Sequence, residues 1–261
     1  MNQRKGWSLI VSLLAAGLIA FPSSTLCAQG TGGDKEKAPA PPATGAEQKK
    51  VTTAESMPVY KPPLRGSPGG RVGGGTRGAA LESPVSLSVL APDHVGLTLE
   101  SRPRLYYFIS KKTTQPLEFT ITEKGAAKPL LEARLKPPEK GGIQCIRLAD
   151  HGVELRQNIP YQWFVAVVTD PDRRSRDILS GGMIEVVSPS ADLSEKLRHT
   201  EKAKQPFVLA QEGIWYDALA ALAEQIAASP KDPSPRKQRA ALLEQVGLTE
   251  AAGAELKESK P

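Results

Sequence analysis

A glycine-rich segment, Gly69–Glu82, has the unusual sequence GGRVGGGTRGAALE, whose residue types could bind phosphate. Its three consecutive glycines, followed by Thr76 and Arg77, are similar in composition to a phosphate-binding loop. Such a loop needs a strand before it, a helix after it and a Lys-Ser/Thr pair at its end. Here a Pro/Gly-rich stretch precedes the segment and a strand-like stretch follows it, so we interpret it as slack chain. The role left open to Arg77 is to pair with a carboxylate where this segment meets the folded part, with glycines allowing close backbone approach.

A second candidate is the loop TDPDRRSRD at residues 169–177. The loop contains aspartates, including Asp170 and Asp172. Their carboxylate oxygens are the ligands that Ca²⁺ prefers. Three arginines lie among these aspartates, however, and their charge opposes a bound cation. The alternative is a hairpin loop in which Asp170 and Asp172 form Asx-type turns, and the pattern favours this alternative. If the loop has a functional role, we expect a polar contact with a partner protein.

Two aromatic residues, Trp215 and Tyr216, lie in the segment GIWYDALAAL. Aromatic side chains at helical spacing usually pack into a core, and we interpret this pair in that way. The functional alternative is a platform on which a sugar ring stacks.

Histidine is too scarce for the common catalytic and metal-binding patterns. His94 and His151 each follow an aspartate, but adjacent side chains rarely face each other, so we expect no catalytic dyad. The sequence has no Gly-x-Ser-x-Gly, His-Glu-x-x-His or clustered-cysteine motif. We therefore predict that the protein is not an enzyme and has no catalytic, cofactor-binding or metal-binding residues.

The N-terminus predicts export. Two basic residues precede an apolar run from Trp7 to Phe21, and a proline and small polar residues follow it. These are the parts of a secretory signal peptide, which we assign to residues 1–28 and expect to be cleaved near Cys27. Because the run is short for a membrane span, we predict no transmembrane segment after cleavage and a periplasmic or extracellular location. An uncleaved anchor and a lipid on Cys27 are the alternatives.

Residues 29–80 are rich in Pro, Gly, Ala and Lys and offer little to bury, which predicts a flexible, disordered tether. Without residues 1–28 the net charge falls from +6 to +4, because 32 basic residues then face 28 acidic ones. A mixed charge of this size favours solubility and loose attraction to anionic surfaces. It does not predict nucleic-acid binding. Cys145 lies in the strand-like stretch IQCIRL, which predicts a buried thiol.

Residues 81–189 contain short segments rich in β-branched and aromatic residues, separated by turn residues. We expect strands at residues 85–90, 95–99, 104–110, 117–123, 130–136, 143–148, 160–169 and 178–187. Even spacing without intervening helices is typical of an antiparallel β-sandwich, here of immunoglobulin- or fibronectin-like type. Leu155 lies six residues before Tyr161, which predicts a tyrosine corner whose hydroxyl bonds the backbone upstream. An ordinary buried tyrosine is the alternative.

Residues 190–258 change to helical spacing. We expect a polar helix first, then a helix opened by Pro206 and continuing to about residue 229, then two further helices. Two segments align at an offset of 34 residues, with Gly213 matching Gly247. A period of 34 is typical of tetratricopeptide helical hairpins. We therefore predict a small helical-hairpin module of that kind, and an α+β fold for the whole chain.

Two of the expected strands are apolar on both faces. In YQWFVAVV, Trp163 lies on one face and Phe164 on the other, and in RLYYFIS the same holds for Tyr107 and Phe108. A sandwich core covers only one face of each strand, so something else must cover the second. We predict that the helix carrying Trp215 docks on this sheet, so that sandwich and helices unfold as one unit.

Several of these segments together resemble a family of exported bacterial proteins catalogued as domain of unknown function 928. The matching pieces lie in order within residues 70–250 and are GGGTRG, VGLTLESRPRLYYFIS, YQWFVAVVTDPDRRS, AQEGIWYDALAALAE and LLEQVGL. GIWYDAL is the most specific of them. The resemblance implies no activity, substrate or functional residue, because the family is itself uncharacterised. Thr169 stands where a cysteine is expected from the family, so a disulfide to that position is not possible here.

The leading prediction for function is a non-catalytic cell-envelope protein that binds another envelope or secreted protein. Helical hairpins and sandwich loops are both common contact surfaces. The alternatives are binding of an envelope glycan or other anionic polymer, helped by the basic tether, and a hydrolase without a recognisable motif. The candidate interaction or structural residues are Arg77, Tyr161, Asp170, Asp172, Trp215 and Tyr216.

Overall fold

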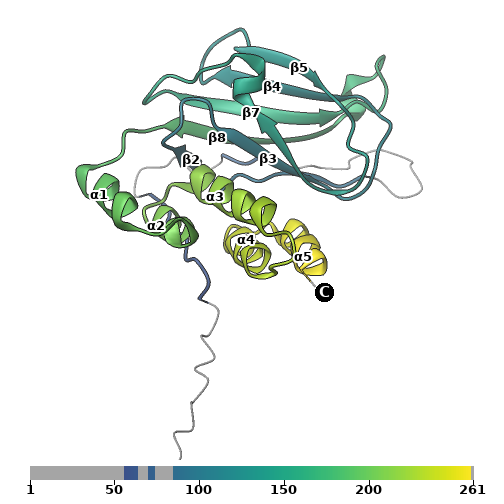
Figure 1. Ribbon diagram of the computed structural model, residues 1–261. Coiled ribbons are helices and arrows are strands. Elements are labelled where there is room, and N and C mark those ends of the chain that lie inside the picture. The colour runs from purple at the N-terminus through teal and green to yellow at the C-terminus, as the bar shows by residue number, and fades with distance from the viewer. Residues whose placement is uncertain (1–55, 64–69, 74–84, 260–261) are drawn as a thin grey trace, which may run out of the picture. The chain divides into compact units, whose positions relative to one another are not determined.

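The structure is a computed structural model that describes residues 56–63, 70–73 and 85–259, all within one compact unit (Figure 1). Within these ranges the fold is α+β, with strands first and helices after them. The strands are β1 (Leu87–Val89), β2 (Val95–Thr98), β3 (Arg104–Ile109), β4 (Leu117–Glu123), β5 (Leu131–Leu135), β6 (Gly142–Arg147), β7 (Pro160–Val167) and β8 (Ile178–Val186). The α-helices are α1 (Ala191–His199), α2 (Gln205–Gln211), α3 (Trp215–Ala228), α4 (Ser234–Gln245) and α5 (Thr249–Glu258).

The strands form two sheets, and more buried residues alternate with less buried ones in some strands, such as β4 and β5, but not in β3 or β8. In β4, Leu117, Phe119 and Ile121 are buried, and the residues between them are more exposed. The larger sheet has the order β2-β8-β7-β4-β5, and the smaller has the order β1-β3-β6. Cys145 on β6 is exposed and not buried as predicted, because the alternation turns its neighbour Ile146 inwards instead.

One strand pairing contradicts the prediction of a purely antiparallel sandwich. β2 runs parallel to β8, with Val95 opposite Met183 and Thr98 opposite Val186. All other pairings between strands are antiparallel in the part of the chain that the structure describes. A parallel pair needs a long connection, and here the connection consists of the strands in between. Strand spacing along the sequence does not reveal such a pairing.

The helices follow the predicted segments with one break. The single helix expected from Pro206 to about residue 229 is divided into α2 and α3 at Gly213, whose φ of +77° is in the region that favours glycine. Gly247 has a φ of +74° and separates α4 from α5 in the same way. Two helical hairpins therefore repeat at the offset seen in the sequence. No helix among the described residues combines the length and the apolar character needed to cross a membrane.

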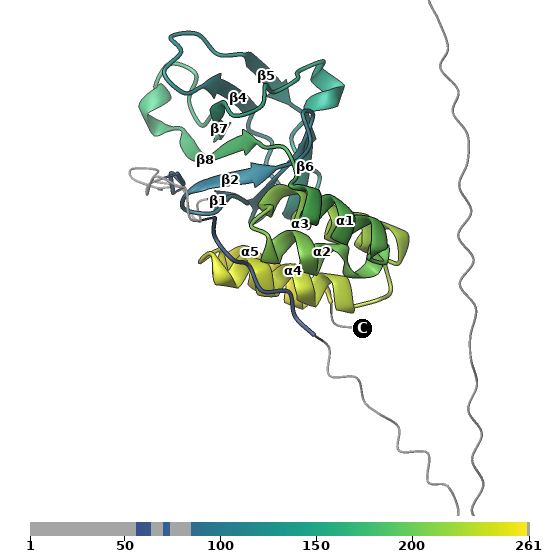
Figure 2. The ribbon, with the colours of Figure 1, turned by 90° about the vertical axis from the view of Figure 1, so that its left-hand side faces the viewer.

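The helices pack across the β2 edge of the larger sheet, on the side opposite β5 (Figures 1 and 2). The Trp215 indole N–H donates to the carbonyl of Leu90 at 2.8 Å. The Tyr216 hydroxyl donates to the carbonyl of Met183 and accepts from the Trp163 indole, both at 2.9 Å. One continuous hydrophobic core includes residues of both sheets and of α1–α5.

A helix covers the second apolar face of β3, as predicted, but not that of β7. Arg104 on β3 pairs with Glu224 on α3, so the second face of β3 is turned towards the helices. Phe164 on β7, in contrast, packs beside Gly181, where an added Cβ would lie 2.3 Å from its ring. It lines a surface cavity of about 380 Å³ to which α1–α5 contribute no residue. On this second face of β7, Gly181 leaves room for the Phe164 ring, and none of α1–α5 covers it.

Residues 56–63 belong to the predicted flexible tether, but they pack against the folded part of the chain. Residues 56–63 cross the helices as the dark blue segment in Figure 2, and only 7 % of Tyr60 is exposed. Its ring meets that of Trp215 edge-on, with ring centres 4.8 Å apart. Its backbone N–H donates to Oε1 of Gln245 on α4 at 2.8 Å. Composition alone missed this segment because a single buried aromatic side chain anchors it.

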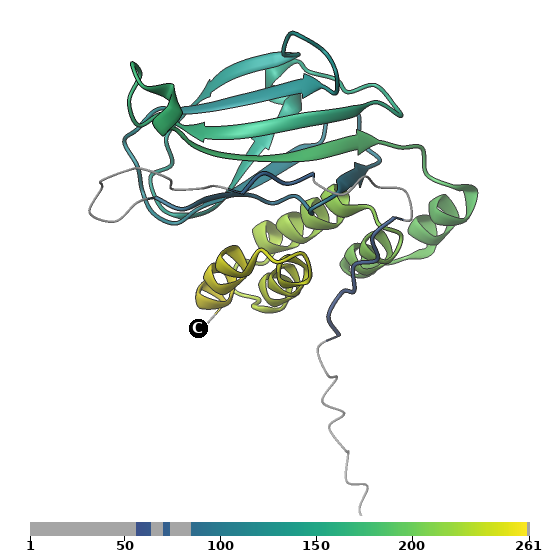
Figure 3. The ribbon, with the colours of Figure 1, turned by 180° about the vertical axis from the view of Figure 1, so that it is seen from behind.

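A second piece of the predicted tether, residues 70–73, joins the helices to the sheets. The Arg71 guanidinium donates to the carbonyl of Val246 at 2.9 Å and to that of Ala91 at 3.4 Å. Val72 and Gly181 exchange backbone hydrogen bonds on the edge of β8 that does not pair with β7. These contacts connect the sheets to the helices. Figure 3 shows from behind that the helices lie below the sheets in this view.

Tyr60→Ala is expected to expose residues 56–63 to proteases. The substitution removes the ring that packs on Trp215, and loss of a large buried aromatic side chain typically costs about 3–5 kcal/mol. Brief subtilisin digestion followed by mass spectrometry should find residues 56–63 protected in the parent protein and cleaved in the variant. Val59→Ala is the control, because Val59 is 61 % exposed. Equal protection in all three proteins would show that Tyr60 does not anchor the segment.

Candidate functional site

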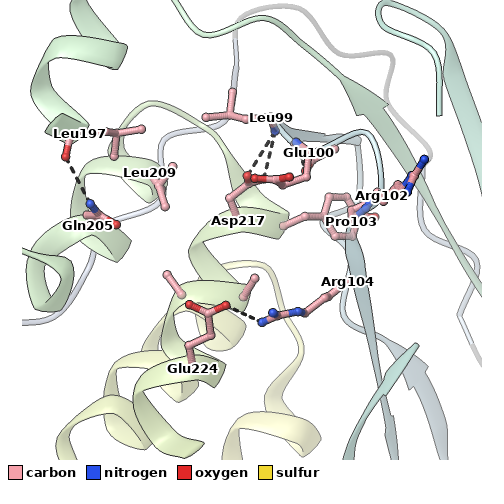
Figure 4. Close-up of a pocket in the computed structure, with 14 residues that line it drawn as sticks. Leu99, Glu100, Arg102, Pro103, Arg104, Leu197, Gln205, Leu209, Asp217 and Glu224 are labelled. Carbon is pink, nitrogen blue, oxygen red and sulfur yellow. Dashed lines mark hydrogen bonds and ion pairs between the residues drawn. The ribbon is translucent and has the colours of Figure 1, made fainter. Parts of the chain in front are cut away.

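A cavity of about 410 Å³ lies between the end of β2, the segment leading into β3, and the helices α1–α3 (Figure 4). We call it the Asp217 cavity. Its apolar wall consists of Leu99, Pro103, Leu197, Leu209, Ala220 and Ala221. Its charged residues are Glu100, Arg102 and Arg104 on the strand side, and Asp217 and Glu224 on α3.

Asp217 owes its position to the two aromatic residues before it. Trp215 and Tyr216 are fixed in the core, so the first turn of α3 presents Asp217 to the end of β2. The backbone N–H of Leu99 lies 3.3 and 3.2 Å from the two carboxylate oxygens, and the Thr98 side chain also bonds the carboxylate. Asp217 thereby satisfies a backbone amide at the point where β2 ends.

Burial raises the pKa of Asp217 from 3.8 to about 6. The negative charge of Glu100 acts in the same direction. The hydrogen bonds from Thr98 and Leu99 favour the ionised form, but they do not outweigh burial. A carboxyl group whose pKa is displaced towards neutrality inside a cavity is a common property of functional sites.

The arginines at the cavity are already paired. The Arg104 guanidinium lies 2.7 Å from the Glu224 carboxylate (Figure 4), and Arg102 pairs at 3.1 Å with a glutamate that does not line the cavity. The Glu100 carboxylate has no hydrogen-bond or ion-pair partner within the ranges that the structure describes. The cavity thus contains two carboxyl groups, on Asp217 and Glu100, without a cation of their own.

This arrangement is suited to binding. The carboxyl groups accept hydrogen bonds or attract positive charge, and the apolar wall can pack an aliphatic chain. The residues that line the cavity include no serine, cysteine or histidine that a base could activate. Among the described residues, no three His, Cys, Asp or Glu side chains are grouped so as to hold a metal ion.

Asp217→Asn is expected to stabilise the protein at neutral pH. The folded protein holds the Asp217 proton more tightly than the unfolded chain does, because the pKa of this group is raised on folding. The free energy of unfolding therefore decreases as the pH rises from about 4 to about 6, by at most about 3 kcal/mol for this displacement. Asparagine keeps an oxygen that can accept from Leu99 and carries no charge.

Urea unfolding at pH 4 and pH 7.5 measures this effect. The parent protein should lose stability between the two pH values relative to Asp217→Asn, and the variant should be the more stable of the two at pH 7.5. Asp172→Asn is the matched control, since Asp172 is exposed. A destabilised Asp217→Asn variant at pH 7.5 would mean that the ionised carboxylate supports the fold.

Tyr161, a candidate from the sequence, is buried at the start of β7. Its hydroxyl accepts a hydrogen bond from the backbone N–H of Arg156 at 3.2 Å, five residues upstream. This contact fixes the chain that enters β7, and Tyr161 does not line the Asp217 cavity.

The alternative in which Trp215 and Tyr216 form a platform for a sugar ring is wrong. Their exposed fractions are 0 % and 1 %, so neither ring can stack on a ligand. The physical reason is the packing of α3 against the sandwich, where both polar groups find partners in the core. Tyr216 nevertheless contributes to the wall of the Asp217 cavity.

Asp170 and Asp172 form a turn. Oδ1 of Asp170 accepts a hydrogen bond from the backbone N–H of Asp172 at 3.0 Å, as expected for an Asx-type turn. Arg174 in the same loop contacts Glu118 on β4 and lies 2.7 Å from Asp177. The loop is therefore tied to the larger sheet by ion pairs, and it is not part of the Asp217 cavity.

Arg77 lies outside the described residues.

Our expectation that neighbouring Asp and His side chains do not meet is wrong at one place: His94 Nδ1 lies 3.1 Å from Asp93 Oδ1. The other ring nitrogen of His94 bonds the Tyr60 hydroxyl at 2.9 Å. Burial raises the pKa of this hydroxyl, so it stays protonated and serves as a packing contact.

Of the residues that line the Asp217 cavity, the sequence indicates Tyr216 alone, and it does not indicate Asp217, because GIWYDALAAL favours a core helix. Asp217 interrupts an otherwise apolar helical run, and an acidic residue at such a position is seldom buried without a specific reason. That was the signal available. Glu100 and Arg104 gave no comparable signal, since charged residues near strand ends are ordinary.

The model of one protein family, described as Domain of Unknown Function (DUF928), matches residues 72–256. This match covers every described strand and nearly all of α5, and it agrees with the resemblance suggested by the sequence motifs. No curated protein matches the chain. Because the family model matches well over half of the sequence, the chain belongs to the DUF928 family.

Proposed function

We propose that the protein is an exported, non-catalytic component of the cell envelope that binds another protein, and that the Asp217 cavity is its contact site. The observation that carries this proposal is a cavity with an apolar wall and two carboxyl groups that lack cations. A surface that leaves charge uncompensated and apolar side chains accessible is suited to a complementary partner. Export rests on the signal-peptide pattern of residues 1–28.

We further propose that the sandwich is related to the immunoglobulin and fibronectin type, and the helical hairpins to the tetratricopeptide type. The bond between Tyr161 and Arg156 supports the first relation. The equivalent glycines Gly213 and Gly247 support the second. Both kinds of scaffold commonly act as binding surfaces, in line with the proposed function.

Site-specific photo-cross-linking in intact cells tests the function. A photoreactive residue at position 100, on the cavity rim, is expected to give one dominant cross-linked protein. The same residue at position 128, in the turn between β4 and β5 at the far edge of the larger sheet, should not give that product.

Filling the cavity supplies the matched variants. Ala221→Trp places a large side chain at the cavity wall and should abolish the product from position 100. Ala227→Trp, on an exposed position of the same helix, should leave it unchanged. Identical products from positions 100 and 128, or a product that survives Ala221→Trp, would contradict the proposed contact site.

One observation favours a second candidate, a hydrolase. Asp217 and Glu100 lie in one cavity, and the pKa of Asp217 is about 6, a value suited to a general acid. In that case the cross-linked partner would be a substrate, and its cleaved form would accumulate with the parent protein but not with Asp217→Asn. A binding protein leaves the mass of its partner unchanged in both.

The glycan alternative rests on the basic tether and gains no support from Trp215 and Tyr216, since both are buried. Binding of an anionic polymer would also have to overcome the uncompensated carboxylates of the cavity. It remains testable by co-sedimentation with purified envelope polysaccharide, where salt should release an electrostatically bound chain.

A further inference from the structure

We propose that the group of the partner protein that enters the Asp217 cavity is a lysine side chain, with its ammonium group bound by the carboxyl groups of Asp217 and Glu100. This inference rests on the proposed function and specifies the chemistry of the same site. It follows from the charges of the cavity, from the geometry of its hydrogen bonds and from its apolar wall.

The charges of the cavity favour a cation. Arg104 is engaged by Glu224 at 2.7 Å, and Arg102 forms its ion pair with a residue outside the cavity. Asp217 inside the cavity and the exposed Glu100 at its rim are thus left to repel each other. A bound cation would remove this repulsion and offset the desolvation of the Asp217 carboxylate.

The hydrogen bonds of Asp217 favour an ammonium group over a guanidinium. Both of its oxygens already face the N–H of Leu99, at 3.3 and 3.2 Å, so no free edge is left for the two parallel bonds that a guanidinium forms best. An ammonium group is a compact charge with three donors. It can use one remaining lone pair of Asp217 and a separate oxygen of Glu100.

The apolar wall suits the stem of lysine. Leu197 and Leu209 come from α1 and α2, and Ala220 and Ala221 come from α3. Four methylene groups can pack along such side chains while the charged end reaches the carboxyl groups. The two alanines keep this side of the cavity open, which is why a tryptophan at position 221 should close it.

Binding of small lysine analogues to the full chain tests the inference. The probes are Nα-acetyl-lysine methylamide and Nα-acetyl-norleucine methylamide, which has an uncharged side chain of similar length. NMR of the ¹³C-labelled methyl groups of Ala220 and Ala221 is the readout at pH 7.5. The lysine compound should shift both signals in a saturable way, and the norleucine compound should not.

Matched variants identify the carboxyl groups. Glu100→Gln should weaken binding of the lysine compound by about two- to fivefold, because Glu100 is exposed and an exposed ion pair contributes up to about 1 kcal/mol. Glu139→Gln, which alters an exposed glutamate paired with Lys136, should bind as the parent protein does. Nα-acetyl-arginine methylamide completes the set and should bind more weakly than the lysine compound.

Three outcomes would overturn the inference. They are equal binding of norleucine and lysine compounds, tighter binding of the arginine compound, and no saturable shift at Ala220 or Ala221. The proposed function fails differently, because it is tested by the cross-link from position 100 and its loss in Ala221→Trp. If that cross-link persists while the lysine compound does not bind, the partner uses the cavity through another group.

Discussion

A chain that ends at Pro189 is expected to lose the folded state of the sandwich. This truncation removes α1–α5 and exposes the face of β3 that carries Tyr106 and Phe108, both buried in the complete fold. It also deprives the Trp163 indole of its acceptor, the Tyr216 hydroxyl. A domain is stable by only about 5–15 kcal/mol, and the loss of several buried aromatic contacts, each worth about 3–5 kcal/mol, is of the same size.

Thermal unfolding and solubility of the truncated chain measure the effect. We expect aggregation, or a transition without cooperativity, where the complete chain melts in a single transition. A chain ending at Ser259 is the control, since it keeps all the helices. A soluble sandwich that melts at the temperature of the complete chain would show that strands and helices form separate folding units.

Glu255→Ala is expected to destabilise the protein by about 3–5 kcal/mol, the usual cost of removing one partner of a buried ion pair. The Glu255 carboxylate on α5 lies 2.7 Å from the Arg239 guanidinium on α4, and the two side chains are only 3 % and 8 % exposed. Alanine leaves the charge of Arg239 buried between the helices without its main counter-ion. Urea unfolding provides the free-energy difference.

Glu258→Ala is the matched control for this experiment. Glu258 also belongs to α5 and lies 2.8 Å from Arg236, but its side chain is 41 % exposed. Exposed ion pairs contribute about 0–1 kcal/mol, so the control should lose little stability. If both alanine variants unfold at the same urea concentration, the buried pair has no special weight in the helical hairpin.

The positions of the strands could be predicted from the sequence because each strand is short and followed by turn residues, and most are rich in β-branched or aromatic residues. Their partners could not. β2 has the same local pattern whether it pairs with β1 or with β8, and its parallel pairing with β8 depends on contacts between residues such as Val95 and Met183. Two strands that are far apart in the sequence carry no local signal that they pair.

Single residues account for the other differences between the sequence-based predictions and the structure. Gly213 ends α2 through a backbone conformation that other residues rarely adopt, whereas helical periodicity continues past it. Tyr60 orders a stretch whose average composition predicts none. Asp217 belongs to an apolar helix, and only the end of β2 beside it reveals why an acid is there. Patterns averaged over a window do not report contacts made by one side chain.

The hydrogen bond from Tyr60 to Gln245 spans 185 residues of the chain, and this separation has a consequence for the order of folding. A chain that emerges from the ribosome N-terminus first has to complete α4 before the backbone of Tyr60 finds its acceptor. The pairing of β2 with β8 waits in the same way for the last strand. Closing such long loops slows folding. Residues near Tyr60 therefore reach their native contacts only once α4 is present, so we expect this segment to dock late in folding.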